Sequence, residues 1–191
     1  MTLLAGTIIF TACGDNTTNS KGNTEKSNNS ASTSTSVTSN ENKKTGSVNE
    51  VVSSYLDLKN ALTNDNGKDA AAAADAIGTN LAKVDETGLT PEQKKVYDDL
   101  KDDIKEHAEH IGSNASNIEH QREHFDLLSR DMIDLVKSTG TDKFLYSDFC
   151  PMYNNKKGAP WLSETKEIKN PYYGSKMIKC GEVKEEIKPK G

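Results

Sequence analysis

Hydrophobic residues follow helical spacing over most of the chain between residues 47 and 138. Ser47 and Glu50 occupy the two positions of a capping box, which predicts the start of a first helix. Thr90 and Gln93 predict another helix start in the same way. The apolar positions of the four predicted stripes are Val51, Tyr55, Leu58 and Leu62; Ala70, Ala73, Ala74, Ile77, Leu81 and Val84; Tyr97, Leu100, Ile104 and Ile111; and Ile118, Phe125, Leu128, Met132 and Leu135.

The breaks between these stripes predict four helices with short connections. Residues 64–67 (NDNG) separate the first two helices, Gly112 ends the third and Gly140 ends the fourth. The second helix is expected to run from about Lys68 to Val84. Four amphipathic helices joined in this way predict an all-α fold, an antiparallel up-down-up-down four-helix bundle. A loop-rich C-terminal segment, with many aromatic residues, prolines and glycines, is expected to pack on it.

The chain begins with a short apolar run and a polar tract. Residues 3–10 (LLAGTIIF) are too few to cross a membrane and are typical of a signal-peptide core. Small residues lead into Cys13, as in a bacterial lipobox, so residues 1–13 are the expected lipoprotein signal peptide and Cys13 the expected lipidation site. Residues 14–46 contain almost no apolar side chains and are expected to form a disordered tether. The helical domain and its C-terminal segment are therefore assigned to residues 47–191.

Composition and charge narrow the possible functions. The 191 residues include 24 Lys and Arg against 29 Asp and Glu, which gives a net charge of −5. Nucleic-acid binding depends on basic side chains that neutralise phosphates, so it is not expected. The sequence has no Ser/His/Asp order, phosphate loop or CxxC pair, so we expect no enzymatic activity. Gly14, rather than Asp, follows Cys13, which favours a lipid-anchored envelope protein at the periplasmic side of the outer membrane.

A small set of sulfur and nitrogen side chains could bind a metal ion. The set contains two histidines, two cysteines and two methionines: His120, His124, Cys150, Met152, Met177 and Cys180. The two histidines are spaced i, i+4 on the fourth helix, so they share one face beside its apolar stripe. Thiolates and thioethers are soft ligands that suit Cu(I), and a histidine would add nitrogen to such a site. His107 and His110 are interpreted as surface residues.

The same cysteines also fit a structural role. In an exported protein, Cys150 and Cys180 could form a disulfide that fixes the C-terminal segment. A methionine beside a cysteine is commonly core filling. An HxxxH pair on a helix, taken alone, equally fits solvated side chains. Spacing therefore leaves the disulfide and the metal site as open alternatives.

Five short motifs follow one another in a specific order. They are HQREHF at 120–125, CPM at 150–152, WLS at 161–163, NPYYG at 170–174 and MIKCG at 177–181. Over roughly residues 48–187 the chain resembles an uncharacterised domain of exported bacterial lipoproteins. The same domain also stands at the C-terminus of periplasmic adaptor subunits of copper/silver efflux pumps. The resemblance implies heavy-metal handling, with copper as Cu(I) favoured and zinc possible, and it supports the same six ligands.

These observations lead to one main hypothesis and one alternative. The main hypothesis is a lipid-anchored protein that binds a soft metal and serves a component of a heavy-metal efflux pump. The alternative is a disulfide-stapled module that binds another envelope protein without metal. In both, the NPYYG motif is expected to form a turn that returns the second cysteine toward the first, and Trp161 to pack the segment on the bundle. Arg122 and Glu123 are interpreted as solvated side chains or as partners that orient the ligands.

Overall fold

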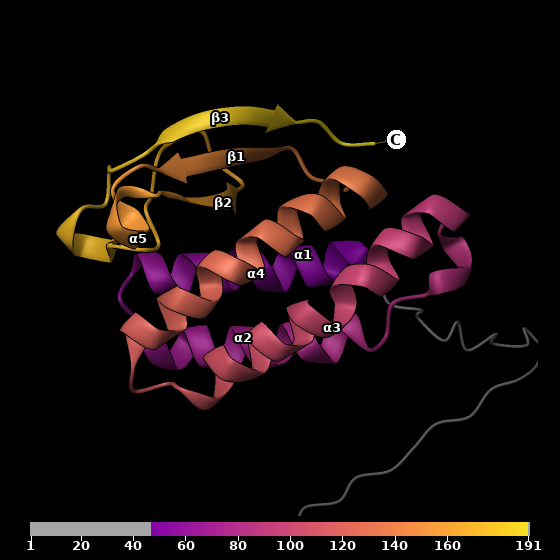
Figure 1. Ribbon diagram of the computed structural model, residues 1–191, viewed down its shortest axis with the longest axis horizontal. Coiled ribbons are helices and arrows are strands. Elements are labelled where there is room, and N and C mark those ends of the chain that lie inside the picture. Colours follow the sequence, from indigo (N-terminus) through magenta and orange to yellow (C-terminus); the bar gives the residue numbers. More distant parts are fainter. Residues whose placement is uncertain (1–46, 191) are drawn as a thin grey trace, which may run out of the picture. The chain divides into compact units, whose positions relative to one another are not determined.

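The computed structural model describes residues 47–190 (Figure 1). The expected signal peptide at 1–13, the lipidation of Cys13 and the expected tether at 14–46 lie outside the described residues. The long helices are α1 (Val48–Thr63), α2 (Gly67–Leu81), α3 (Pro91–Ser113) and α4 (Ile118–Thr139). The other elements are η1 (Glu86–Gly88), between α2 and α3, and then β1 (Leu145–Cys150), α5 (Tyr153–Lys156), β2 (Ala159–Ser163), η2 (Gly174–Lys176) and β3 (Glu182–Ile187). No helix among residues 47–190 is both long and apolar enough to cross a membrane.

Local sequence explains where the helices begin and end. The capping box predicted at Ser47 is present, and the helix start predicted at Thr90 proves to be a second capping box. In the second box, the Thr90 hydroxyl accepts from the Gln93 N–H at 3.3 Å, and the Gln93 side chain accepts from the Thr90 N–H at 2.9 Å. Helix α2 ends at Leu81, before the predicted Val84, and the Tyr97 hydroxyl donates to the Leu81 carbonyl there at 2.9 Å.

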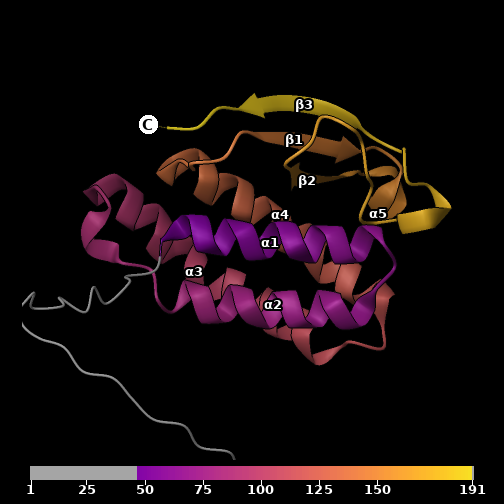
Figure 2. The ribbon, with the colours of Figure 1, turned by 180° about the vertical axis from the view of Figure 1, so that it is seen from behind.

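Helices α1 to α4 enclose one hydrophobic core. Helix α1 lies beside α2, α2 beside α3, and α3 beside α4 (Figure 1, Figure 2). The whole predicted stripe of α1 is buried, and Ile77, Ile104, Phe125 and Met132 from the other three helices are buried with it. Burial of these apolar stripes is the main force that holds the helices together. Residues 47–190 are therefore mostly helical, as predicted, while the up-down-up-down bundle itself stays a prediction.

The C-terminal segment contains a three-stranded antiparallel sheet, so the prediction of an all-α fold was wrong for this part of the chain. The strand order is β2-β1-β3, with Cys150 opposite Ala159 and Phe149 opposite Glu182. Each strand has only five or six residues, and β3 pairs with a strand far earlier in the sequence. The prolines and glycines around the strands favour loops locally. The pairing that stabilises the sheet is long-range and leaves little local signal.

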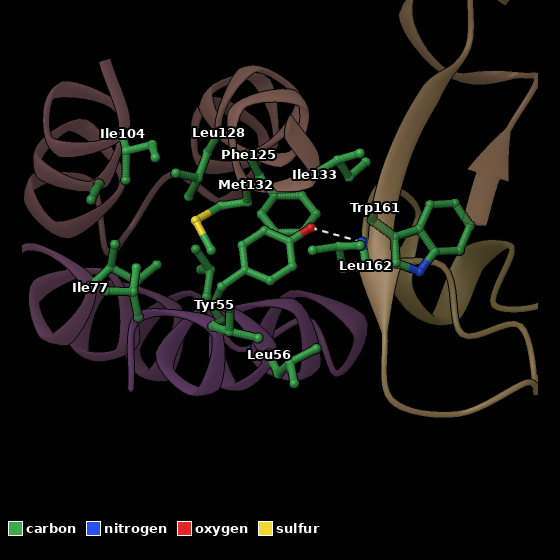
Figure 3. Packing of buried hydrophobic residues seen from close by; sticks show 14 of the residues in the cluster. Tyr55, Leu56, Ile77, Ile104, Phe125, Leu128, Met132, Ile133, Trp161 and Leu162 are labelled. Carbon is green, nitrogen blue, oxygen red and sulfur yellow. Dashed lines mark hydrogen bonds between the residues drawn. The ribbon is translucent and has the colours of Figure 1, made fainter. Parts of the chain in front are cut away.

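The sheet packs on α1 and α4, which separate it from α2 and α3 (Figure 1, Figure 2). Tyr55 of α1 lies at this interface, where its hydroxyl is 2.7 Å from Ser129 Oγ and accepts from the Leu162 N–H at 3.1 Å (Figure 3). Phe125 stacks on Tyr55 with ring centroids 5.4 Å apart. Leu162 faces the helices, whereas Trp161 lies on the other side of the strand (Figure 3). The expected packing of Trp161 on the helices is therefore made by its neighbour.

Candidate metal centre

All four histidines of the chain lie where α3 and α4 face each other, close to the connection between them. His107 and His110 come from α3, and His120 and His124 come from α4. Asn117 caps α4, because its side-chain oxygen accepts from the His120 N–H at 3.2 Å. The connection is short, so the end of α3 lies beside the start of α4. This geometry brings the four imidazoles together.

Three of these imidazoles are placed so that one nitrogen from each could approach a common ion. The candidate ligand atoms of His110, His120 and His124 all lie within 4.8 Å of one another. The His110 and His124 rings stack with centroids 4.2 Å apart, and the His120 ring meets His124 edge-on at 4.7 Å. His110 is exposed and the other two are half-buried. Imidazole nitrogens bind zinc and copper, so the donor set fits a transition-metal ion with one side open to solvent.

His107 and His110 belong to this cluster, although the sequence led us to interpret them as surface residues. The His110 side chain is indeed 47% exposed, but its ring faces α4. Sequence spacing gives the face that a histidine occupies on its own helix, but not how α3 and α4 lie against each other. A useful signal was the symmetry about the short connection, with an i, i+3 pair before it and an i, i+4 pair after it.

The surroundings of His124 favour its neutral form. Burial lowers the pKa of His124, and the other three histidines lower it further. Glu123 opposes this effect, and its carboxylate lies 3.3 Å from Nδ1 of His120. The neutral imidazole is the form that binds a metal ion. The cluster therefore keeps a nitrogen lone pair of His124 available at neutral pH.

His107 lies next to His124 but outside the group of three. Its Nδ1 is 3.3 Å from Nδ1 of His124, and the two ring centroids are 5.5 Å apart. Asp131, about two turns after His124 on α4, is half-buried, and its charge interacts with His107. His107 therefore interacts both with the carboxylate of Asp131 and with the candidate ligand His124.

The two candidate cysteines lie together at the end of β1. The Sγ atoms of Cys150 and Cys180 are 3.4 Å apart, and both cysteines are free thiols. Cys150 is buried and Cys180 is half-buried. Burial raises the pKa of Cys180, and the hydrogen bond with Cys150 raises it further. The proximity that both the disulfide and the metal interpretations require is therefore present.

The two candidate methionines lie on the surface close in sequence to the cysteines. The side chains of Met152 and Met177 are 43% and 42% exposed. The Met177 carbonyl accepts from the Cys180 N–H at 2.9 Å. Within residues 47–190, neither cysteine belongs to the group of ligand atoms that the histidines form. The structure thus separates the two histidines on α4, which His110 joins, from the two cysteines beside the sheet, and the two methionines lie exposed on the surface.

Arg122 holds the C-terminal segment, although the sequence led us to interpret it as solvated or as a partner of the ligands. It is only 6% exposed. Its Nε donates to the Pro171 carbonyl at 2.8 Å, and its Nη2 donates to the Leu62 carbonyl at 2.9 Å. The same Nη2 lies 2.6 Å from Asp65. Arg122 therefore connects α4 with the end of α1 and with the NPYYG motif.

The side chain of Asn170 stabilises the predicted turn through hydrogen bonds to the backbone. It is fully buried, and its side-chain oxygen accepts from the N–H groups of Tyr172 at 2.8 Å and Tyr173 at 3.1 Å. Its side-chain nitrogen donates to the Cys180 carbonyl at 2.5 Å. The prediction that this motif returns the second cysteine to the first is confirmed by the contact of Cys180 with Cys150.

Asp148 is a buried polar residue that no sequence pattern indicated. It lies in the central strand β1 with 0% exposure, and neither carboxylate oxygen has a hydrogen-bond partner in the described part of the chain. Burial raises the pKa of Asp148 to about 7, against the attraction of Lys59. Lys59 is itself buried and pairs with Glu164 at 2.8 Å. Because an unpaired buried carboxylate is costly, burial favours the neutral form of this carboxyl group.

Comparison with known proteins identifies one region of similarity. No curated protein and no solved structure matches the chain. Residues 51–143 match the family described as "Protein of unknown function (DUF3347)". The matched region includes all four histidines and ends before β1 and the cysteine pair. The helical part of this chain is therefore similar to the uncharacterised family DUF3347.

Proposed function

We propose that this protein binds a copper or zinc ion in heavy-metal handling, and that His110, His120 and His124 form the binding site. The observation that supports the proposal is the approach of three imidazole nitrogens to within 4.8 Å of one another. The low pKa of His124 adds to it, since metal and proton compete for the same lone pair. Two of these residues are the histidines that the sequence singled out, and His110 joins them from α3.

The sulfur side chains supply a second and softer set of ligands. Cys150 and Cys180 are already in contact, and Met152 and Met177 are exposed near them in sequence. Thiolate and thioether ligands suit Cu(I), whereas an all-imidazole site suits Cu(II) and Zn(II) as well. The ion is cargo in this proposal, and the protein holds it without catalysing a reaction.

Metal titration of the full chain tests this function. The protein is prepared reduced and without oxygen, and its affinities for Zn(II) and Cu(I) are measured against competing chromophoric chelators. A His120→Ala/His124→Ala variant should lose at least about 100-fold in Zn(II) affinity. A Cys150→Ser/Cys180→Ser variant is the matched control and should keep its Zn(II) affinity while its Cu(I) affinity falls. Unchanged Zn(II) binding in the double histidine variant would contradict the site.

The proposed cellular setting is the envelope, with a lipid anchor at Cys13 and a component of a heavy-metal efflux pump as partner. Support comes from the lipobox pattern of residues 1–13 and from the resemblance to exported lipoproteins. Mass spectrometry of the mature protein should find a lipid-modified Cys13 as the first residue. A Cys13→Ser variant should remain as the longer precursor. An unmodified mature N-terminus at another position would rule out the anchor.

A second candidate function follows from the 3.4 Å contact between Cys150 and Cys180. We propose as the alternative a disulfide-stapled module that binds another envelope protein. A thiol–disulfide oxidant of the envelope would accept the two electrons, and the two thiols would release two protons as the bond forms. Thiol titration after purification without reductant separates the candidates. If Cys150 and Cys180 both titrate as free thiols in protein isolated from the envelope, the disulfide is absent and this alternative is contradicted.

A further inference from the structure

We propose that His107 is a positioning residue for the metal site. It accepts a hydrogen bond from Nδ1–H of His124 and so leaves Nε2 of His124 unprotonated for the ion. This inference rests on the proposed function, because it assigns the orientation of one of the three ligands. His107 is not a fourth member of the ligand group, which contains only His110, His120 and His124 within residues 47–190.

As a hydrogen bond, the contact between the two rings has two possible arrangements of protons. The Nδ1 atoms of His107 and His124 face each other at 3.3 Å, so one carries a proton and the other presents its lone pair. If His107 donated, the neutral His124 would carry its proton on Nε2 and both of its nitrogens would be occupied. If His124 donates, its Nε2 is free. Only the second arrangement is compatible with His124 as a ligand.

The residues around His107 favour this second arrangement. When His107 accepts at Nδ1, its own proton is on Nε2. Asp131 interacts electrostatically with the His107 ring, and a negative charge near the ring favours a polarised N–H group on it. Histidine ligands in proteins commonly donate their second N–H to a neighbour, which fixes the tautomer and the ring orientation. Here the neighbour of His124 is the imidazole of His107, which in turn interacts with the half-buried carboxylate of Asp131.

Nitrogen-15 NMR of the full-length protein tests the tautomer without any metal. Long-range proton–nitrogen correlations distinguish the protonated from the unprotonated ring nitrogen in each histidine. We expect His124 to carry its proton on Nδ1 and His107 to carry its proton on Nε2. A His124 protonated on Nε2 would overturn the inference. This result is independent of metal binding, so a protein that binds no metal would refute the proposed function and still yield a tautomer assignment.

Variants of His107 test its effect on the ligand. In His107→Ala, the acceptor is lost, and Zn(II) affinity should fall about 10- to 100-fold with the stoichiometry unchanged. His107→Asn is the matched control, since its side-chain oxygen can take the position of Nδ1 and should restore most of the affinity. Asp131→Asn should cause a smaller loss. Equal affinity in the alanine variant would overturn the inference. X-ray absorption of the zinc-loaded His107→Ala variant gives a second check. One fewer nitrogen bound to the metal than in the wild type would also overturn the inference, because His107 would then be a ligand.

Discussion

Arg122 and Asp65 form an ion pair between α4 and the turn after α1, with Nη2 and Oδ1 2.6 Å apart. The other carboxylate oxygen of Asp65 accepts from the Ser175 N–H in η2 at 3.0 Å. One acidic side chain therefore connects α1, α4 and the C-terminal segment. A Cβ on Gly174 would collide with both partners of the ion pair, and Gly174 adopts a positive φ of 52°. The glycine of the NPYYG motif thus permits this close approach.

Replacement of Arg122 should destabilise the fold. In Arg122→Met, the Leu62 and Pro171 carbonyls and the Asp65 carboxylate all lose a donor, which should cost about 2–3 kcal/mol in the free energy of unfolding. Urea unfolding followed by circular dichroism measures this loss. Lys95→Met is the control, because Lys95 forms an exposed ion pair with Asp99 and its loss should leave stability almost unchanged. Equal losses in the two variants would contradict the role of Arg122.

The Asp65 carboxylate should contribute to stability in a defined range of pH. Hydrogen bonds from Ser175 and from Arg122 lower the pKa of Asp65 to about 2 from its ordinary value of 3.8. Because the folded pKa is depressed, the contribution is fully present above about pH 4 and is lost as pH falls toward about 2. Asp65→Asn should therefore be less stable than the wild type at neutral pH, by about 1 kcal/mol after solvent screening. Denaturation at several pH values should show this difference shrinking in acid, and a constant difference would contradict the explanation.

The helices could be predicted from the sequence because their signals are local. The capping residues Ser47 and Thr90 lie within four residues of their partners, and the apolar stripes repeat inside each helix. The sheet depends instead on partners far apart in the chain, as in the pairing of Phe149 with Glu182. The register shift between Ser147 and Asp148 further disturbs the alternation of inward-facing and outward-facing residues along β1. Sequence periodicity carried little of this information.

The candidate site was predictable only in part, for the same physical reason. The i, i+4 spacing places His120 and His124 on one face, but the approach of His110 depends on how α3 lies beside α4. The contact of Cys150 with Cys180 was expected from the turn at Asn170. Whether sulfur and nitrogen ligands would meet depended on the packing of the C-terminal segment, which the motifs alone did not determine.

The Tyr55 hydroxyl should stabilise the contact between the helices and the sheet. In Tyr55→Phe, the buried N–H of Leu162 and the Ser129 hydroxyl lose a partner, which should cost about 1–2 kcal/mol. The ring stays in place, so the stacking on Phe125 is retained. Tyr146→Phe is the matched control, because the Tyr146 hydroxyl makes no hydrogen bond within residues 47–190. Thermal unfolding of both variants should show a lower Tm for Tyr55→Phe alone, and a wild-type Tm in that variant would contradict the assignment.

Zinc binding at the histidine cluster should stabilise the folded chain. A ligand that binds only the folded state at about 100 times its Kd adds roughly 2.7 kcal/mol to the free energy of unfolding, so the Tm should rise by several degrees. A chelator should reverse the rise. Acidification below about pH 6 should remove it, because protonated imidazoles do not bind metal. The rise should be much smaller in His110→Ala, which lacks one of the three ligands, and should persist in Cys150→Ser, which leaves the nitrogen set intact. An equal rise in the wild type and His110→Ala would show that zinc stabilises the protein from another site.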